Sequence, residues 1–401
     1  MPVRPRAYVA LSVVAAVGAL FGVQGIAPAM PALGRDLGVS DAQLGLFTAA
    51  YMLPAVIFAL PLGYFADRYG RRRVFVASVL AYSLAGGAQA LLSDYWTLLA
   101  LRFVQGIGFG ALMPLSMTMI GDVLRGTAQL RAQSRRQIAM SAGEFALPLV
   151  GAALASISWR AALGAQAALL PLAFVGAALL AGMKTPPMQE RYARELSEAV
   201  AQPGMPGVLI AGFLRFVCKF ALIAYLPVLL VGSRGASLAE AALVLSVASG
   251  VAALTNFAIV ALMRRVAASA LLSVAVVLIG GAMAGFALAG SWQVALLVAV
   301  VFGLGDGMLT VVQNALVTEA APDRVRAGLV AVSATTRNAG KLVAPLAIGA
   351  LSLAVPVSLA FGLVGAAVVA TIPALRQVRA LDGLLTDRRN SEAIFSYPIS
   401  E

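Results

Sequence analysis

Five basic and two acidic side chains of this 401-residue sequence lie inside long apolar stretches, where a charge is expensive to bury. They are, in chain order, Arg102, Glu144, Arg215, Lys219, Asp306, Arg337 and Lys341. Two pairs of these cations, beginning at Arg215 and at Arg337, are spaced by four residues, so the members of each pair lie on one face of a helix. Ionisable residues in such surroundings mark ligand sites, proton paths or ion pairs, and these seven are the first candidates for function.

The cations outnumber the acids, and this surplus of positive charge predicts the substrate. An uncompensated charge inside a membrane protein costs several kcal/mol even after relaxation, so something must offset it. We expect water, chloride or, most simply, an anionic substrate whose carboxylate, phosphate or sulfonate is bound by paired donors. Three alternatives stay open: a purely structural charge network, lysines that burial has deprotonated, and a cationic or neutral amphiphile as the substrate.

Three further residues on the same stretches are substrate-site candidates: Gln313 and Asn338 as orienting groups, and Tyr225 as an aromatic contact for an amphiphile with an apolar part. The chain has no histidine, so we expect carboxylates to carry any transported proton, and Glu144 and Asp306 are the candidates. The single cysteine allows no internal disulfide, and together with the lack of histidine it argues against a metal centre. We therefore expect no metal and no cofactor.

Membrane helices must position these residues, because the composition is that of a chain dissolved in lipid. The sequence is 61% hydrophobic and 11% charged, whereas a soluble domain is about 25% charged. Twelve apolar segments have about the length of a membrane span and are rich in Gly, Ala and Leu, without the short alternation of barrel strands. They lie near 7–32, 43–64, 73–92, 95–121, 137–158, 161–183, 206–231, 238–263, 267–289, 292–319, 326–350 and 353–375. The sequence therefore predicts an all-α integral membrane protein with twelve transmembrane helices.

The basic residues are distributed unevenly between the loops that connect these helices. Most of the 29 Lys and Arg residues, Arg136 among them, fall on the side of the N-terminus, and few fall on the other side. The positive-inside rule then places both termini in the cytoplasm and the chain, as a multi-pass protein, in a bacterial-type inner (plasma) membrane. The formal charge of +12 thus reflects topology, and we expect no nucleic-acid partner.

The two halves of the sequence repeat each other. Residues 106–123 align without gaps on 303–320, and the same shift makes Glu144 equivalent to Lys341. Six helices followed by six more in a parallel repeat is the plan of a two-lobed secondary transporter. We predict an N-terminal lobe, a cytoplasmic linker, a C-terminal lobe and a cytoplasmic tail at 1–183, 184–205, 206–376 and 377–401 respectively.

The loop after the second predicted helix reads GYFADRYGRRR over 63–73. It resembles the signature of the major facilitator superfamily, Gly-x-x-x-Asp-Arg-x-Gly-Arg-Arg/Lys, at the position where that family carries it. The matching residues are Gly63, Asp67, Arg68, Gly70, Arg71 and Arg72. The resemblance implies that this loop is a conformational switch that locks two lobes together, with Asp67 and Arg71 as its main residues. The alternative is that its arginines only fix the topology.

Two further segments resemble motifs of the proton-driven efflux members of that family. LLALRFVQGIGFGA (98–111) matches the motif of the fourth helix and implies that Arg102 lies in or beside the substrate cavity and takes part in proton coupling; the alternative is a structural ion pair. GEFALPLVG (143–151) matches the motif of the fifth helix, with two of its glycines replaced. The first helix contains no acid, so the resemblance leaves Glu144 or Asp306 as the proton site.

The resemblance covers essentially the whole chain and is greatest to the twelve-span drug:proton antiporters. It implies the major facilitator fold, with two pseudo-symmetric six-helix lobes, and a monomer in membrane lipid that couples protons to a small-molecule substrate by alternating access. We expect proton-coupled efflux of an anionic or amphiphilic organic compound. The alternatives are proton-coupled uptake of an organic anion by symport, and a non-transporting membrane receptor or lipid-modifying protein on the same fold. No nucleophile–base constellation supports an enzyme.

Overall fold

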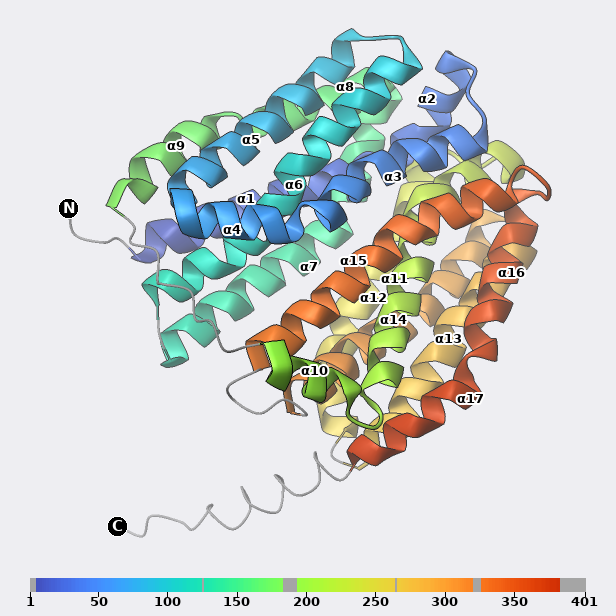
Figure 1. Ribbon diagram of the computed structural model, residues 1–401. Helices are drawn as coiled ribbons and strands as arrows, with labels where there is room; N and C mark the ends of the chain where they lie inside the picture. Colours follow the sequence, from blue (N-terminus) through green and yellow to red (C-terminus); the bar gives the residue numbers. More distant parts are fainter. Residues whose placement is uncertain (1–4, 125, 183–192, 264, 320–325, 383–401) are drawn as a thin grey trace, which may run out of the picture.

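The computed structural model describes residues 5–124, 126–182, 193–263, 265–319 and 326–382, and every regular element in these ranges is a helix (Figure 1). The first half comprises α1 (Pro5–Gln24), η1 (Ala27–Ala29), α2 (Met30–Leu37), α3 (Asp41–Ile57), α4 (Ala59–Tyr69), α5 (Arg71–Ala88), η2 (Gln89–Leu91), α6 (Tyr95–Val123), α7 (Gly126–Ile157), α8 (Trp159–Gly164), η3 (Ala165–Leu169), α9 (Pro171–Leu179) and η4 (Leu180–Gly182). A short helix, α10 (Ala193–Ala201), follows. The second half comprises α11 (Met205–Pro227), η5 (Val228–Ser233), α12 (Leu238–Leu262), α13 (Ala268–Leu288), α14 (Trp292–Glu319), α15 (Arg326–Leu351), α16 (Val357–Ala370), α17 (Ile372–Leu375) and η6 (Arg376–Leu381).

Within the described residues, ten helical segments are long and apolar enough to cross a membrane. The two other predicted spans are also helical but depart from that pattern for identifiable reasons. The second span is divided between α3 and α4, and the eleventh, α15, carries Arg337 and Lys341. The order of helices is therefore consistent with the twelve predicted spans, six before α10 and six after it.

Short polar sequences begin the helices on one face of the bundle. Ser40 and Ser237 each start a capping box, in which the serine hydroxyl accepts from the backbone N–H three residues later and the side chain of that later residue accepts in return. A third cap, Asp94, begins α6. We call this face the distal end, and we call the opposite face, where α1 begins at Pro5 and the described chain finishes at Asp382, the terminal end (Figure 1).

Five helices of the described chain contain an internal proline, which removes the backbone donor for the carbonyl four residues earlier. These prolines are Pro54, Pro114, Pro148, Pro227 and Pro345, in α3, α6, α7, α11 and α15. Shortly after Pro54 the second span breaks at Phe58, which separates α3 from α4. Pro148 and Pro345 coincide in the sequence repeat, so both lobes carry this feature at the same place.

Equivalent glycines let equivalent helix pairs approach closely in the two halves. A Cβ atom on Gly106 would lie 2.3 Å from the carbonyl oxygen of Tyr51, and one on Gly303 would lie 2.5 Å from that of Ala248. These contacts join α6 to α3 and α14 to α12. The glycines are therefore packing sites, as their small-xxx-small spacing predicts, and the repeat of sequence is also a repeat of structure.

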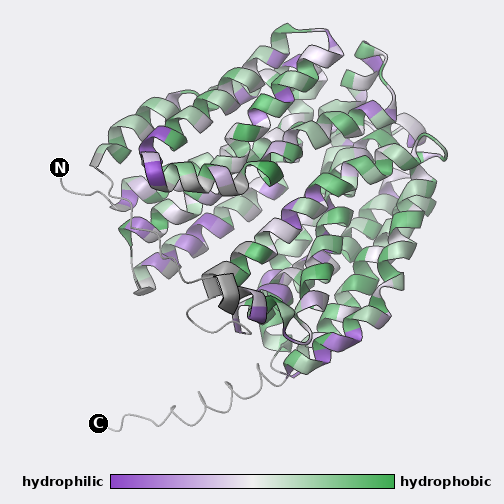
Figure 2. Cartoon of the chain, in the orientation of Figure 1, coloured by the Kyte–Doolittle hydropathy of each residue, from purple (hydrophilic) through white to green (hydrophobic). Residues whose placement is uncertain are grey.

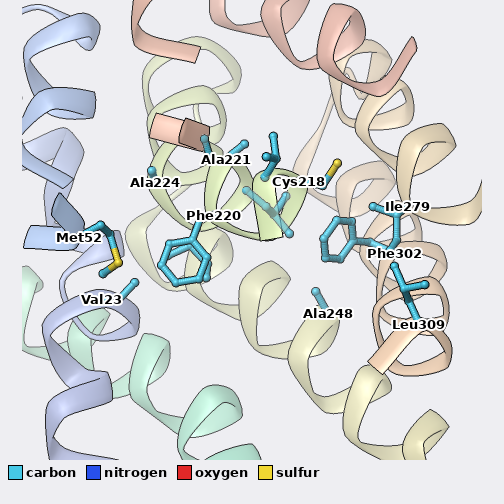
Figure 3. Close-up of a cluster of buried hydrophobic side chains, with 14 of the residues drawn as sticks. Val23, Met52, Cys218, Phe220, Ala221, Ala224, Ala248, Ile279, Phe302 and Leu309 are labelled. Carbon is cyan, nitrogen blue, oxygen red and sulfur yellow. The ribbon is translucent and has the colours of Figure 1, made fainter. Parts of the chain in front are cut away.

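The helices form two lobes, α1–α9 and α11–α17, that meet along two seams (Figure 1). In one seam α3 packs along α15, and in the other α7 packs along α12. Between the seams, Val23 and Met52 of the first lobe lie beside Phe220 and Ala224 of α11 (Figure 3). The terminal half of the second span, α4, packs against α5 and α6 of its own lobe. The lobes are thus joined towards the distal end.

Hydropathy follows this arrangement. Residues coloured as hydrophobic make up most of the helices of both lobes, while hydrophilic stretches gather at the terminal end and in the terminal half of α7 (Figure 2). A bundle with this pattern places its apolar surface against lipid and its charges either at the membrane surface or between the lobes.

Candidate functional site

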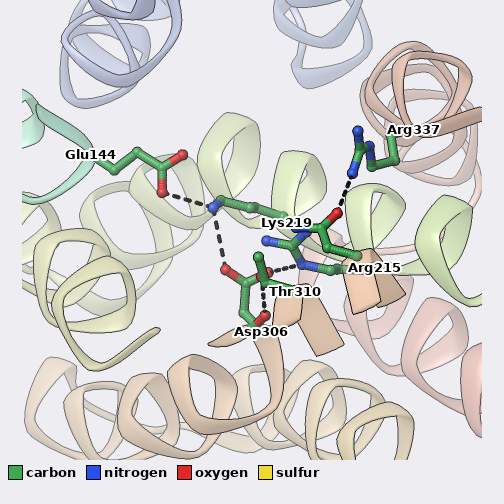
Figure 4. Close-up of polar contacts among 7 residues, drawn as sticks. Glu144, Arg215, Lys219, Asp306, Thr310 and Arg337 are labelled. Carbon is green, nitrogen blue, oxygen red and sulfur yellow. Dashed lines mark hydrogen bonds and ion pairs between the residues drawn. The ribbon is translucent and has the colours of Figure 1, made fainter. Parts of the chain in front are cut away.

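Four charged side chains form one network between the lobes, which we call the central network: Glu144, Arg215, Lys219 and Asp306 (Figure 4). Arg215 Nε lies 2.5 Å from Asp306 Oδ1, and Lys219 Nζ lies 3.2 Å from Asp306 Oδ2. Lys219 Nζ also lies 2.9 Å from Glu144 Oε2. Two acids and two cations therefore neutralise each other in the region where the sequence predicts a charged cavity.

Helix spacing explains how this network is held. Arg215 and Lys219 project from consecutive turns of α11 towards α14, so both reach the carboxylate of Asp306. Thr310, one turn further along α14, donates its hydroxyl to the backbone carbonyl of Asp306. Arg215, Lys219 and Asp306 are all buried, and charges in such a place persist only with partners. This part of the network therefore holds the second lobe together.

Glu144 differs from Asp306 in its lobe and in its exposure. It projects from α7 of the first lobe, so its bond to Lys219 crosses from one lobe to the other. The Glu144 side chain is 26% exposed, whereas the Asp306 side chain is 3% exposed. Of the two predicted proton carriers, Glu144 is thus the one that solvent reaches.

The two predicted cations of α15 make different contacts. Arg337 Nη1 donates to Asn314 Oδ1 at 3.1 Å (Figure 4). Lys341 Nζ lies 5.1 Å and 5.6 Å from the ring centroids of Phe216 and Phe220 on α11, which is the geometry of a cation–π contact. Neither cation forms an ion pair with a carboxylate of the described residues, and both are only partly buried. They are the part of the predicted positive surplus that the described residues do not compensate.

Arg102 lies elsewhere, in the core of the first lobe. Its Nη1 donates to Gln105 Oε1 at 2.8 Å, and its guanidinium carbon lies 4.6 Å from the ring centroid of Phe47 and 5.0 Å from that of Tyr51. Gln105 bonds in turn to Gln166. The expected group of five cations is therefore a group of four, because amides and ring faces of its own lobe hold Arg102 in place.

The three remaining candidates for contacts with the substrate lie in different surroundings. Asn338 is half-buried on α15. Gln313 is fully buried between α14 and α15, where its Nε2 lies 3.4 Å from Ser333 Oγ. Tyr225 is fully buried in the α3–α15 seam, and its hydroxyl donates to the backbone oxygen of Asp41 at 2.9 Å. Gln313 and Tyr225 thus join helices in this conformation, which the sequence did not indicate because it does not tell which helix faces which.

The sequence profile of the Major Facilitator Superfamily matches residues 12–345 and 208–385. The chain belongs to the Major Facilitator Superfamily. Its fold is similar to the solved structure of a bacterial homologue of the human lysosomal transporter Spinster, in an inward-facing and unoccupied conformation. That structure gives a TM-score of 0.74 at 19% sequence identity, and the match covers 97% of this chain and 98% of the other.

Curated relatives of this superfamily member are transporters. The bacillibactin exporter of Bacillus subtilis (strain 168) is 32% identical over 139 residues, which is 33% of this chain and 35% of the exporter. The 4-hydroxybenzoate transporter PcaK of Pseudomonas aeruginosa is 42% identical over 92 residues, 23% of this chain and 20% of that protein. A gallate transporter of Pseudomonas putida is 37% identical over 94 residues, 23% of this chain and 21% of that protein. These alignments span about a fifth to a third of the length of the relatives.

The predicted switch loop of this superfamily member is tied to its own lobe. Arg71 forms an ion pair with Asp122 near the end of α6, and its Nη1 donates to Thr118 Oγ1 at 2.7 Å. Gly70 has a φ of +89° between α4 and α5, a conformation that glycine adopts without steric cost. The glycine therefore makes the tight turn that brings the arginine back onto α6.

The structure describes fewer contacts for the other residues of the motif at 63–73. Arg68 is exposed, and its guanidinium carbon lies 5.8 Å from the ring centroid of Tyr69. Gly63 and Asp67 lie outside the residues whose side chains and surroundings the structure describes. The role of this motif as a conformational switch stays a prediction.

Arg136 is a buried cation that the sequence analysis missed. We expected it in a loop, but α7 begins at Gly126 rather than near residue 137, so Arg136 lies within the helix. Its Nε and Nη2 both donate to Ser116 Oγ, at 3.0 Å and 2.7 Å. Its place in the helix can be predicted if charges are allowed in the first turns of a long membrane helix.

Proposed function

We propose that this superfamily member is a proton-coupled transporter of small organic anions that works by alternating access. The observation that carries the proposal is the position of Arg337 and Lys341, which are partly exposed beside the central network and without a carboxylate partner among the described residues. The two cations of the central network are matched by acids. An anionic group that reached both α15 cations would form charge-assisted hydrogen bonds, which are the strongest available to it.

The surroundings of Lys341 favour a substrate with an aromatic part. Phe216 and Phe220 present ring surfaces beside its ammonium group, so a planar ring could pack there while its carboxylate reaches Lys341 and Arg337. 4-Hydroxybenzoate and gallate, for which two of the relatives are named, are aromatic carboxylates of this kind. Aromatic carboxylates and amphiphilic anions built on them are therefore the proposed substrate class.

Glu144 is the proposed proton carrier, because it is the more exposed of the two acids of the central network. Its protonation removes a negative charge and releases one contact of Lys219, so the region becomes more positive. A more positive region binds an anion more tightly, and by linkage the bound anion then strengthens proton binding. Proton and anion favour each other in this scheme, which is the sign required for symport and hence for the uptake alternative.

Efflux is the second candidate. It is favoured by the motif at 98–111 on α6 and by the similarity to the bacillibactin exporter. Antiport requires the proton and the anion to oppose each other's binding. The two directions therefore differ in a measurable sign: on acidification the affinity for the anion rises in a symporter and falls in an antiporter.

We also propose that the protein acts as a monomer in a bacterial inner membrane with both termini in the cytoplasm. The arginines of the loop between α4 and α5 lie at the terminal end, and the positive-inside rule favours the cytoplasm for such a cluster. In this orientation the lobes are joined on the extracytoplasmic side.

A thermal-shift titration of the purified protein tests the anion site. We expect 4-hydroxybenzoate and gallate to raise the melting temperature, since a ligand at a hundred times its Kd stabilises a protein by about 2.7 kcal/mol. A size-matched aromatic amine should have no effect. Arg337→Ala and Lys341→Ala should each abolish the shift. Arg160→Ala, which removes a cation paired with Asp36 on the surface, is the matched control and should respond like the wild type.

Wild-type responses in both α15 variants would show that the anion site is placed wrongly. Flux into proteoliposomes under an imposed pH gradient then measures the direction, because accumulation of labelled anion with inward-moving protons supports uptake and expulsion supports efflux. Binding without any flux would revive the receptor alternative.

A further inference from the structure

An apolar groove runs along the outer flank of the α3–α15 seam, and we call it the seam groove. It has a cavity volume of about 470 Å³ and takes its lining from both lobes. Its lining includes Leu46 and Ala49 of α3, Trp96 and Ala100 of α6, and Leu342 and Leu346 of α15. All of these side chains are apolar apart from the indole N–H of the tryptophan.

Small side chains next to a tight helix crossing explain the groove. A Cβ atom on Gly45 would lie 2.6 Å from the carbonyl oxygen of Pro345, so α3 and α15 are in close contact at that point. One turn further along α3, the small side chain of Ala49 faces the groove, and Ala100 faces it from α6. Helices α3 and α15 thus touch at the glycine and, together with α6, leave a hollow at the alanines.

We propose that the seam groove binds an acyl chain of a membrane lipid. The groove is open on the flank that faces the bilayer, where Leu46 is 37% exposed and Leu346 is 42% exposed. Water would find almost no hydrogen-bond partner there, and apolar cavities of this kind stay dry unless an apolar group fills them. A flexible hydrocarbon chain matches both the shape and the chemistry of the lining.

Trp96 indicates to which leaflet of the membrane the lipid belongs. It is the second residue of α6 at the distal end, and its side chain is 65% exposed. Tryptophan is enriched at the level of the headgroups in membrane proteins. The lipid therefore belongs to the leaflet at the distal end, with its headgroup near the start of α6 and its chain extending along the seam.

The position of the groove has a consequence for the transport cycle. Because Ala100 belongs to the first lobe and Leu346 to the second, the groove exists only while α3 and α15 are packed together. A ligand that binds one conformation of a protein shifts the population towards it. A lipid in the groove thus stabilises the conformation in which the lobes are joined at the distal end, whichever solute the protein carries.

Photolabelling in proteoliposomes tests this site. A phospholipid with a diazirine in one acyl chain is incorporated into the bilayer, and the labelled peptides are identified by mass spectrometry. We expect labelling to concentrate on α3 and α15 and to saturate as the amount of labelled phospholipid rises. Unlabelled phospholipid should compete and reduce it. Labelling that is spread evenly over the outward-facing helices, or that rises without saturation, would overturn the proposal and identify the groove as ordinary lipid-facing surface.

A groove-filling variant sharpens the test. In Ala100→Trp the new ring occupies the groove, and displacing even two methylene groups of the chain is expected to weaken labelling at least about tenfold. Ala366→Trp, at an exposed alanine of α16 outside the groove, is the control and should be labelled like the wild type. Equal labelling of wild type and Ala100→Trp would contradict the site. Competition of the label by 4-hydroxybenzoate would assign the groove to the substrate instead and also overturn the lipid proposal.

Discussion

Arg102 in the first lobe and Lys341 in the second share an arrangement but differ in accessibility. Each is a cation without a carboxylate partner among the described residues, and each lies over two aromatic rings spaced by four residues on a neighbouring helix. Arg102 is 3% exposed and donates to Gln105, so its charge is enclosed by the protein. Lys341 is only partly buried. The first cation is held inside its lobe, whereas the second is the one that we propose binds a ligand.

The sequence repeat shows how the lobes diverged in charge. Asp306 occupies the position that Phe109 occupies in the first lobe, and Lys341 occupies that of Glu144. The second lobe therefore contains the cations that we propose bind the anion and the buried acid that holds its helices, while the first lobe contributes one partly exposed acid across the interface. In the proposed function, one lobe binds the substrate and the other exchanges the proton.

The largest effect is expected from Asp306→Asn, which keeps the size of the side chain and removes its charge. Arg215 and Lys219 would lose their buried partner, and breaking such a pair costs about 3–5 kcal/mol of stability. The melting temperature in detergent should fall steeply. Asp36→Asn, which breaks an exposed pair with Arg160, is the control and should change little. A variant of Asp306 as stable as the wild type would show that the second lobe does not depend on this network.

The comparison of the two cations is tested by Lys341→Met and Arg102→Met. For Lys341→Met we expect unchanged or higher stability and a loss of anion affinity of at least about tenfold, since a hydrogen bond to a charged group contributes about 1.5–3 kcal/mol. For Arg102→Met we expect lower stability and unchanged anion affinity, because Gln105 loses a buried partner while the anion site is intact. Thermal unfolding and ligand titration measure both quantities. If the two variants behaved alike, the distinction between a supporting and a binding cation would be wrong.

Glu144→Gln tests whether Glu144 is the group that exchanges the proton. The amide keeps the shape of the side chain, but it cannot exchange a proton and it carries no charge opposite Lys219. Anion affinity should become independent of pH and resemble that of the wild type at low pH, a difference of about 5- to 150-fold if the coupling is of ordinary size. Binding measured across a pH series checks this. A pH dependence that survives in the variant would move the proton site to another group.

The smallest effect is expected from Tyr225→Phe, which removes the hydrogen bond to Asp41 across the α3–α15 seam and so weakens the joined distal end by about 0.5–1.5 kcal/mol. Spin labels at exposed Leu91 and Leu288, one on each lobe, should report a larger population of separated distal ends. Tyr95→Phe removes a similar bond, but one that stays within the first lobe, and should leave the distances unchanged. The same distances in both variants would exclude Tyr225 as a contact that holds the lobes.

The repeat and the helix packing could be predicted from the sequence because they depend on local patterns. Membrane-length apolar segments are visible in the chain, and the Gly106 and Gly303 clusters indicate close packing by their spacing alone. The ionic partners could not be predicted in the same way. Lys219 pairs with residues from two different helices, and which helices face each other depends on their rotation and tilt in the folded bundle.

Two candidates make contacts that the sequence does not indicate, for the same reason. Arg102 lies at a depth similar to that of the other cations, but depth along a helix does not determine which side of it a residue occupies. The aromatic ring of Tyr225 suits an amphiphile, yet its hydroxyl donates to a backbone carbonyl of the other lobe. In both cases the sequence indicates the chemistry of the side chain but not its neighbour.

The internal prolines have a mechanical consequence for this superfamily member. Pro148 and Pro345 each follow a charged residue by four positions, so the carbonyl oxygens that lose their helical donors are those of Glu144 and Lys341. The backbone is therefore most compliant where the carboxylate and the ammonium group are mounted. A gain or loss of charge at either residue therefore acts at the most flexible point of its helix. Protonation of the carboxylate or binding of a ligand to the ammonium group can bend the helix there without unfolding the turns on either side.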